Sequence, residues 1–425
     1  MSQPVESLLR NSMVPIPSAS DSNPSWRRSF LMGLAVYVAT LLPVVLGVVA
    51  GLEVLTPGRE IPYGQDRLLL RFAAWDGGQF MEIMDNGYQY QPKQISNIVV
   101  FPGYPVLGQL VRKSTGLSAA ASLLVVSHIC LLVTLIIYHR LMRLRFGRDE
   151  TADVSLMVLA VLPTTFFWRM AYSESPFVMM EVLFLYGMQR KWSCERLAVV
   201  VGVATSFRLV GLAMLLPVAM EFADRSLTKT SRLTLRRLWQ GCLVVAISLS
   251  GICAFMMFQW IRFGDAMLFA KGQESYFLRP PVNALDHWYR LVTLEPVWAT
   301  YLPESDCYWY RHARTPGMLL NLQFWNPIWF SLTCGLVFWG WFRRILTDTE
   351  SALGAALLLI PYIGRAEEFC MGCQARYATA AIPAIIVLGQ LLSGTPAIVR
   401  AGVVIAGVSL LTLYSAMFGA WYFFL

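Results

Sequence analysis

The feature that most constrains this chain is a series of long apolar runs separated by short charged segments. A transmembrane helix needs about 20 mainly apolar residues, and runs such as 30–52 reach that length. Only helices and closed barrels satisfy the backbone polar groups in lipid, and barrel strands alternate apolar and polar residues. Stretches such as 399–425 are apolar at almost every position instead. The pattern therefore predicts an all-α polytopic membrane protein.

Composition and charge support this prediction. The chain of 425 residues is 56% hydrophobic and only 14% charged, with a mean hydropathy of +0.53, whereas about a quarter of the residues in a soluble protein are charged. A soluble fold of this size cannot bury so much apolar surface. The net charge of +8 does not indicate nucleic-acid binding, because the Lys and Arg residues form small clusters between apolar runs, as the positive-inside rule requires.

The N-terminal segment reads as a tail. Its first 25 residues are polar and rich in Ser and Pro, and the apolar run that follows Arg27 and Arg28 is too long for a cleavable signal peptide. We expect residues 1–26 to be a disordered cytoplasmic tail and residues 27–425 to be a single transmembrane domain.

Apolar length and Lys/Arg bias predict about 11 transmembrane helices, with the C-terminus outside. Two large external loops are predicted at 53–115 and 263–321. The expected helices are 30–52, 117–138, 152–170, 175–189, two half-helices within 197–220, then 238–262, 322–342, 351–365, 374–392 and 400–424.

The stretch 197–220 is predicted to break in its middle. As one span it would place the basic cluster after it on the external side, and its centre carries the polar segment 205–208. A polar break with Arg208 at membrane depth favours two short helices whose tip lines a cavity. Arg208 is suited to a phosphate, because its planar guanidinium binds such groups with two hydrogen bonds. The alternative is a structural ion pair with Glu174 or Glu181.

The first external loop holds the strongest candidate for chemistry. Apolar side chains there recur at helical spacing and predict a short interfacial helix that Gly87 ends. Asp76 stands near its start, where a carboxylate at the membrane surface can meet both a lipid-linked and a soluble substrate. The alternative is that Asp76 only caps the helix and Trp75 only anchors it at the interface. The apolar residues are Phe72, Trp75, Phe80, Ile83 and Met84.

Other motifs lie at the ends of predicted spans. The prolines and glycine of 101–105 predict a rigid turn rather than a helix. Glu174 comes out on the same side of the membrane as Asp76, although it is also suited to the first turn of the next helix. Asp265 follows Gly264 in a turn that opens the second loop, and Arg376 begins the penultimate span close to the outer surface.

The cysteines and acids of one short loop have a simple structural interpretation. Cys370 and Cys373 have the spacing of a redox or metal site, but no second such pair accompanies them, so zinc is poorly supported. An external compartment favours a local disulfide between them. Glu367 and Glu368 are expected to pair with Arg365 or Arg376. No metal motif is visible in the sequence and no cofactor is predicted. Binding of a divalent cation stays an open alternative.

Several short motifs follow one another along the chain. They are Trp75-Asp76, Gly87-Tyr88, Phe101-Pro102, Tyr172-Ser173-Glu174, Gly202-x-Ala204-Thr205-x-x-Arg208-x-x-Gly211, Phe263-Gly264-Asp265 with Phe269 and Gln273, and Arg376-Tyr377. In this order they resemble the motifs of the PIG-V type mannosyltransferases, which include the enzyme that adds the second mannose of GPI anchors and bacterial relatives of it. That family belongs to the GT-C membrane glycosyltransferases. The resemblance covers roughly residues 27–425 and fits a bacterial relative.

The resemblance implies a GT-C-like bundle that transfers a hexose, usually mannose, from a polyprenyl- or dolichyl-phosphate donor. The acceptor would be a lipid-linked or cell-surface glycan on the external or luminal face of a bacterial plasma membrane or the endoplasmic reticulum. Asp76 would be the base of an inverting reaction, Arg208 would bind the donor phosphate, and Glu174 would line the same cavity. Substrate-binding roles are also implied for Trp75, Gln79, Tyr172, Asp265, Gln273 and Arg376.

The sequence departs from the family pattern in places that concern the acceptor. The family often has His or another aromatic residue where Gln79 stands, and a Phe-Phe-Pro-Leu-x-Pro run at 100–105. Two other functions remain open: a multi-span transporter or lipid flippase, and a non-catalytic assembly subunit. The enzyme hypothesis requires that Asp76, Glu174 and Arg208 converge.

Overall fold

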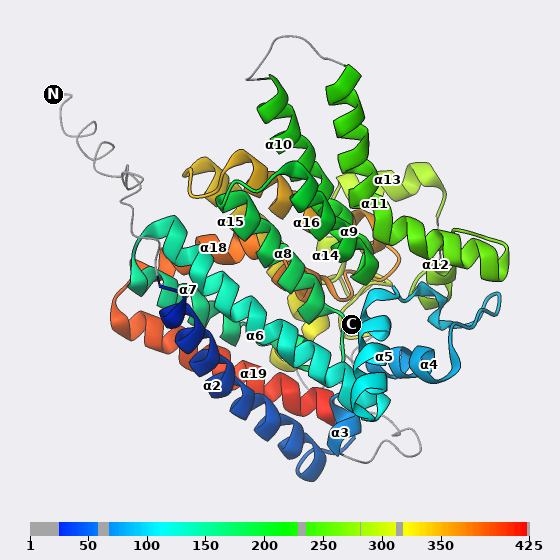
Figure 1. Ribbon diagram of the computed structural model, residues 1–425. Helices are drawn as coiled ribbons and strands as arrows, with labels where there is room; N and C mark the ends of the chain where they lie inside the picture. Colours follow the sequence, from blue (N-terminus) through cyan, green and yellow to red (C-terminus); the bar gives the residue numbers. More distant parts are fainter. Residues whose placement is uncertain (1–24, 58–67, 228–234, 281, 312–317, 423–425) are drawn as a thin grey trace.

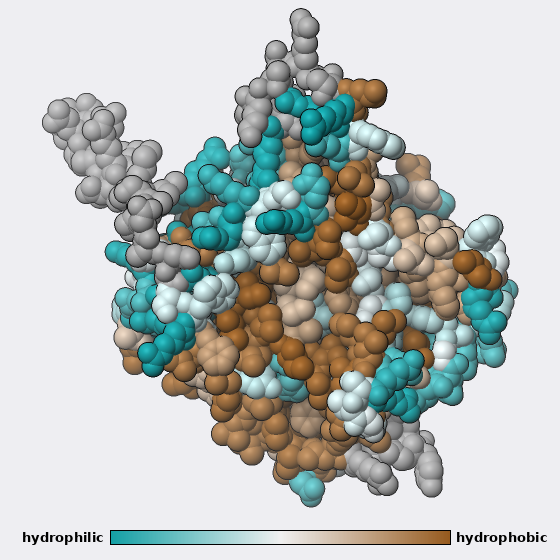
Figure 2. Space-filling model, viewed as in Figure 1, coloured by the Kyte–Doolittle hydropathy of each residue, from teal (hydrophilic) through white to brown (hydrophobic). Residues whose placement is uncertain are grey.

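The computed structural model describes residues 25–57, 68–227, 235–280, 282–311 and 318–422, and all regular elements in these ranges are helices. This confirms the all-α prediction. The predicted disordered tail falls almost wholly outside the described residues. One continuous apolar core joins most of the helices, and Figure 2 shows apolar side chains covering much of the face over α2 and α6.

Four helices are long and apolar enough to cross a membrane, and a fifth span is formed if the pair α7 (Asp149–Val161) and η2 (Pro163–Arg169), which is bent by 77°, counts as one. In Figure 1 three of the four, α2, α6 and α19, lie side by side. The prediction of about 11 crossings therefore stays a prediction, although helices occur at every predicted span. The four long helices are α2 (Trp26–Glu53), α6 (Ala119–Phe146), α11 (Leu235–Phe263) and α19 (Ala397–Gly419).

The predicted break at Arg208 is confirmed. Helix α9 (Cys194–Phe207) ends at Arg208, whose backbone is extended with φ −155° and ψ 143°. The chain resumes as η3 (Leu209–Met214) and α10 (Leu215–Leu227). Small residues hold this region tightly against α11, since a Cβ atom on Gly202 would lie 2.4 Å from the Ile247 carbonyl.

The first loop contains the predicted interfacial helix. Helix α4 (Asp76–Asn86) begins at Asp76 and ends before Gly87, whose φ of 77° suits glycine. The predicted rigid turn at 101–105 is wrong, because α5 (Gly103–Thr115) begins there. Prolines are tolerated in a first helical turn, where their missing N–H leaves no hydrogen bond unmade.

The rest of the fold surrounds these elements. The second loop carries short helices, and α17 is a separate short helix in front of α18. The remaining elements are α3 (Leu68–Arg71), η1 (Asn97–Val99), α8 (Glu174–Gln189), α12 (Leu268–Lys271), η4 (Gly272–Tyr276), α13 (Ala284–Val292), α14 (Glu295–Ala299), η5 (Met318–Leu320), α15 (Leu322–Phe342), α16 (Asp348–Arg365), α17 (Gln374–Thr379) and α18 (Ile382–Ser393).

Candidate active site

The turn that presents Asp76 is held by an aromatic residue from a distant part of the chain. Trp75 has a φ of 60°, which is unfavourable for a bulky side chain and persists only where the surroundings impose it. The buried Tyr172 hydroxyl accepts a hydrogen bond from the Asp76 N–H at 3.2 Å and donates one to the Ala74 carbonyl at 3.1 Å. The Trp75 ring lies 5.2 Å from that of Trp421. These contacts fix the start of α4.

Arg376 of α17 pairs with acidic residues from two distant parts of the chain, Asp76 of the first loop and Glu174 of α8. Its Nη1 lies 2.8 Å from an Asp76 carboxylate oxygen, and its Nε donates to the Glu174 carboxylate. The guanidinium also lies against two aromatic rings, with its carbon 4.7 Å from the centre of Tyr172 and 4.8 Å from that of Phe167. Arg376 is thereby held in one orientation, and no local sequence feature indicates either aromatic contact.

Glu174 connects Arg376 to Arg208. Arg208 Nη1 lies 2.6 Å from the same carboxylate and 3.4 Å from the Ser173 hydroxyl. Its guanidinium carbon is 5.5 Å from the centre of the Tyr377 ring. The ion pair that was the structural alternative for Arg208 therefore exists, and it is made with Glu174. It also belongs to the same network as Asp76.

The carboxylates of Asp76 and Glu174 differ in their exposure to solvent. The side chain of Asp76 is 48% exposed, whereas that of Glu174 is 3% exposed and lies between two guanidinium groups. A carboxylate that accepts an incoming proton must be reachable by the substrate, so Asp76 is suited to chemistry and Glu174 to positioning. A small pocket beside the network is lined by Glu174, Phe177, Arg208, Val210, Leu357, Arg376, Tyr377 and Ala380.

Gln79 of the first loop forms a hydrogen bond with the second loop. Its amide donates to the Tyr276 hydroxyl at 3.0 Å, and that hydroxyl donates to the Ser96 carbonyl at 3.3 Å. The two other candidates from the second loop make local contacts. Asp265 pairs with Lys271, whose hydrogen bond lowers the pKa of that exposed carboxyl, and the Gln273 amide lies 3.5 Å from the Phe269 carbonyl. Their substrate-binding roles stay predictions.

Replacing Tyr276 by Phe is expected to weaken the junction between the loops. The substitution removes the hydroxyl that both contacts share, at a cost of about 1 kcal/mol. The unfolding temperature of the purified protein in lipid nanodiscs would fall accordingly. Tyr289→Phe is the matched control, because Tyr289 is 69% exposed on α13. Equal unfolding temperatures for the two variants would contradict the proposed junction.

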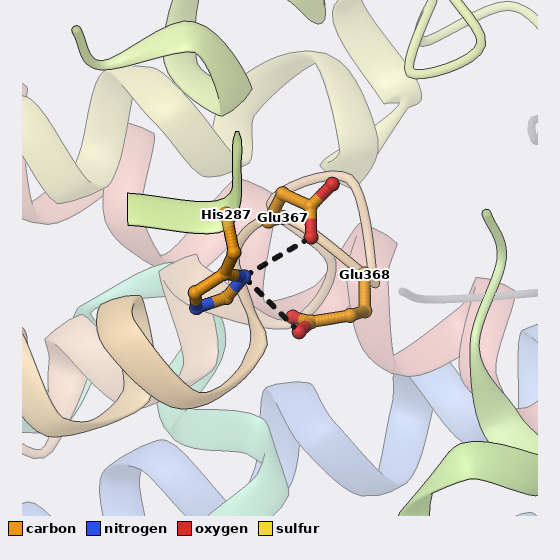
Figure 3. Close-up of side chains that lie close together, drawn as sticks. All are labelled: His287, Glu367 and Glu368. Atoms are coloured by element: carbon orange, nitrogen blue, oxygen red, sulfur yellow. Dashed lines mark hydrogen bonds and ion pairs between the residues drawn. The ribbon is translucent and has the colours of Figure 1, made fainter. Parts of the chain in front are cut away.

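A second cluster of ligand-type side chains lies at the base of the second loop. The His287 Nδ1 is 3.2 Å from Glu367 and 3.5 Å from Glu368, and the three side chains converge as shown in Figure 3. Glu367 is also paired with Arg290 at 2.6 Å and Arg279 at 3.3 Å. These guanidinium groups compete with a metal ion for the carboxylate. The expected pairing of Glu367 with Arg365 or Arg376 is wrong, because the second loop supplies the cations.

The packing around Cys370 does not support the predicted bond to Cys373. No disulfide links any of the eight cysteines in the structure. Cys370 is buried against Cys307 of the second loop. The CxxC spacing therefore did not identify the neighbour of Cys370.

Comparison with known families decides the class of the protein. The family described as Mannosyltransferase (PIG-V) matches residues 47–275, more than half of the chain. The chain belongs to the PIG-V mannosyltransferase family. It is an integral membrane glycosyltransferase, as the motifs predicted, and this favours the enzyme over the transporter and assembly-subunit alternatives. The match includes Asp76, Glu174 and Arg208 and ends before Arg376, which the fold brings to the same place.

Solved structures with a similar course of the chain are oligosaccharyltransferases of Archaeoglobus fulgidus. One, tethered to an acceptor peptide, is 13% identical with a TM-score of 0.41, over 92% of this chain and 55% of that one. The other, AglB with an inhibitory peptide and a dolichol-phosphate, is 12% identical with a TM-score of 0.40, over 93% and 56%. The chain spans about half the length of these proteins. No curated protein matches the sequence.

Proposed function

We propose that this glycosyltransferase moves a mannose from a polyprenyl- or dolichyl-phosphate donor to a lipid-linked or cell-surface acceptor, with inversion at the anomeric carbon. The reaction takes place on the external or luminal face of a bacterial plasma membrane or the endoplasmic reticulum. The observation that carries the proposal is the half-exposed Asp76 carboxylate, held by Arg376 beside a buried Glu174–Arg208 pair.

In this mechanism Asp76 is the general base. Its free carboxylate oxygen takes the proton of an acceptor hydroxyl as the hydroxyl oxygen attacks the anomeric carbon. The bond from that carbon to the phosphate oxygen breaks, and the lipid phosphate leaves with the electron pair. The attack and the departure occur on opposite faces of the sugar, so the configuration inverts.

The two arginines interact with the negatively charged groups of the reaction. Arg208 binds the donor phosphate and stabilises the negative charge that grows on it during departure. Arg376 orients the Asp76 carboxylate, and Glu174 keeps both guanidinium groups in place. Tyr172 supports Asp76 from its backbone side, where its hydroxyl meets the N–H of that residue. Each element of the network thus has a separate task.

The test is sugar transfer in membranes that contain the protein, with radiolabelled polyprenyl-phosphate mannose as donor. Lipid extracts and surface glycans are analysed for new mannosylated products, and the anomeric configuration of the product is determined. The proposal predicts inverted products that depend on this donor. Transfer from polyprenyl-phosphate glucose alone, or products with retained configuration, would overturn the choice of sugar or of mechanism respectively.

Arg208→Lys is expected to raise the KM for the donor about tenfold or more. The variant keeps the positive charge but loses the planar group that binds a phosphate with two hydrogen bonds, each worth about 1.5–3 kcal/mol when charged. Steady-state kinetics over a range of donor concentrations would show this change. Arg225→Lys is the control, since Arg225 pairs with Glu221 on α10. An unchanged KM for Arg208→Lys would remove Arg208 from the donor site.

A further inference from the structure

The second loop is fastened to the segment before α17 at several points. The N–H groups of Leu278 and Arg279 both donate to the Glu368 carbonyl, at 2.9 and 3.3 Å. The Arg279 side chain is 8% exposed and pairs with Glu295 at 3.1 Å and Glu367 at 3.3 Å. A buried guanidinium with two carboxylate partners tolerates little displacement, so the two segments hold a fixed relative position.

Two cysteines meet at this junction. Cys307 comes from the second loop and Cys370 from the segment before α17, and both are fully buried. They form one small cluster with Ala299, and their thiol groups hydrogen-bond to each other. The two residues are far apart in the sequence, so it is the tertiary fold and not local spacing that places them next to each other.

The surroundings of Cys307 favour its ionised form. The hydrogen bond from Cys370 lowers the pKa of the Cys307 thiol, and the nearby Arg279 acts in the same direction. The Arg279 Nη1 lies 3.1 Å from the Cys307 sulfur. Since the thiolate is the form that attacks a disulfide, Cys307 is the more reactive member of the pair.

The backbone around Cys370 has an unfavourable conformation that surrounding contacts must stabilise. Cys370, Met371 and Cys373 have φ values of 51°, 60° and 63°. Such values are unfavourable for residues other than glycine and persist where other contacts impose them. Among the contacts that do so, Gln323 of α15 donates to the Cys370 carbonyl.

We propose that Cys307 and Cys370 form a disulfide bond in the mature protein, and that this bond joins the second loop to the segment leading into α17. The proposal rests on the proposed function in one respect, the external or luminal face, where disulfides persist.

The bond forms while the second loop folds onto the segment before α17 and the thiols are still accessible, by thiol–disulfide exchange with an oxidised dithiol oxidoreductase of that compartment. The Cys307 thiolate attacks a sulfur of the oxidant's disulfide, which gives a mixed disulfide and releases one thiolate of the oxidant. Cys370 then loses its proton and attacks the Cys307 sulfur, which frees the second oxidant sulfur. The two cysteines lose two protons and two electrons, and the oxidant becomes a dithiol.

The bond has a consequence for the active site. Cys370 lies shortly before α17, the helix from which Arg376 reaches Asp76 and Glu174. The second loop in turn contacts the first through Tyr276 and Gln79. Fixing the junction covalently therefore limits the movement of both segments that meet around Asp76.

The test uses the full chain, taken from membranes that are denatured in SDS with N-ethylmaleimide present, so that buried thiols also react, and digested without reduction. Mass spectrometry is expected to find the Cys307 and Cys370 peptides linked, and to find the link also in Cys373→Ser. In Cys307→Ser the Cys370 peptide is expected to carry the maleimide. Reduction is expected to lower the unfolding temperature of the unmodified chain by about 2–5 °C, and not that of Cys307→Ser. Alkylated Cys307 and Cys370 before reduction, or a Cys370–Cys373 link, would overturn the proposal.

Two further measurements separate this proposal from the function. Tyr289→Cys on the exposed side of α13 is labelled in intact cells with a membrane-impermeant maleimide, which reports the face of the second loop. Mannose transfer is assayed on the same membranes. External labelling with transfer but free Cys307 and Cys370 thiols would overturn the disulfide and leave the function intact. A linked pair without transfer would support the disulfide and overturn the function.

Discussion

Asp76→Asn is expected to lower the rate of mannose transfer about 10²–10⁴-fold, the contribution typical of a general base. The amide has the shape of the carboxylate but cannot take the acceptor proton. It also carries no charge for Arg376, so the guanidinium loses part of its hold on α4. The measurement is kcat with saturating donor and acceptor in membranes that hold equal amounts of each protein.

The control for this variant lies on the same helix. Glu82→Gln neutralises an exposed carboxylate of α4 and is expected to change kcat less than twofold. Stability separates loss of chemistry from loss of fold. Because Asp76 is half exposed, its ion pair with Arg376 contributes at most about 1 kcal/mol, and the unfolding temperature of Asp76→Asn should stay close to that of the unmodified chain. Equal kcat for Asp76→Asn and the unmodified chain would remove Asp76 from the mechanism.

Local features of the site were predictable from the sequence. The beginning of α4 at Asp76 and its end at Gly87 follow from apolar spacing and from the φ that glycine allows. The break at Arg208 follows from polar residues inside an apolar run, where an unbroken span would be costly. In both cases the residues that determine the structure lie within one or two turns of the feature itself.

Pairings between distant segments were not predictable in the same way. Arg376 was a candidate from its motif, yet its contact with Asp76 depends on how α17 lies against the first loop. Cys370 was assigned to its sequence neighbour, and Glu367 to cations close by in the chain. Both instead have partners in the second loop. Nothing in the spacing distinguishes a local partner from a distant one when both have suitable chemistry.

The turn predicted at 101–105 failed for a different reason. Proline and glycine usually end regular structure, but at the start of a helix a proline removes an N–H that has no partner there. The close approach of Gly103 to the broken span explains why a glycine stands at this first position of the helix. A Cβ atom on Gly103 would lie 2.5 Å from the Ser206 hydroxyl oxygen. In this segment proline and glycine therefore allow a helix start and a close tertiary contact, which the local sequence pattern does not reveal.

Glu174→Ala is expected to destabilise the protein by about 3–5 kcal/mol, the cost of breaking a buried ion pair by removing one partner. Glu174 is 3% exposed and lies between the guanidinium groups of Arg208 and Arg376. Without it, two like charges face each other at a site with little solvent. The unfolding temperature in nanodiscs would fall, and transfer would be lost with it, because neither arginine keeps its position.

A second substitution distinguishes charge from packing in this variant. Glu174→Ala leaves Arg208 without a carboxylate, whereas Arg376 keeps its pair with Asp76. Adding Arg208→Met removes this unpaired charge, so we expect part of the lost stability to return while transfer stays absent. Non-additive effects of this kind are the signature of residues in direct contact. Glu221→Ala is the control, since its pair with Arg225 is partly exposed and worth at most about 1 kcal/mol. Additive losses in the double variant would show that Glu174 stabilises the site through packing and not through its charge.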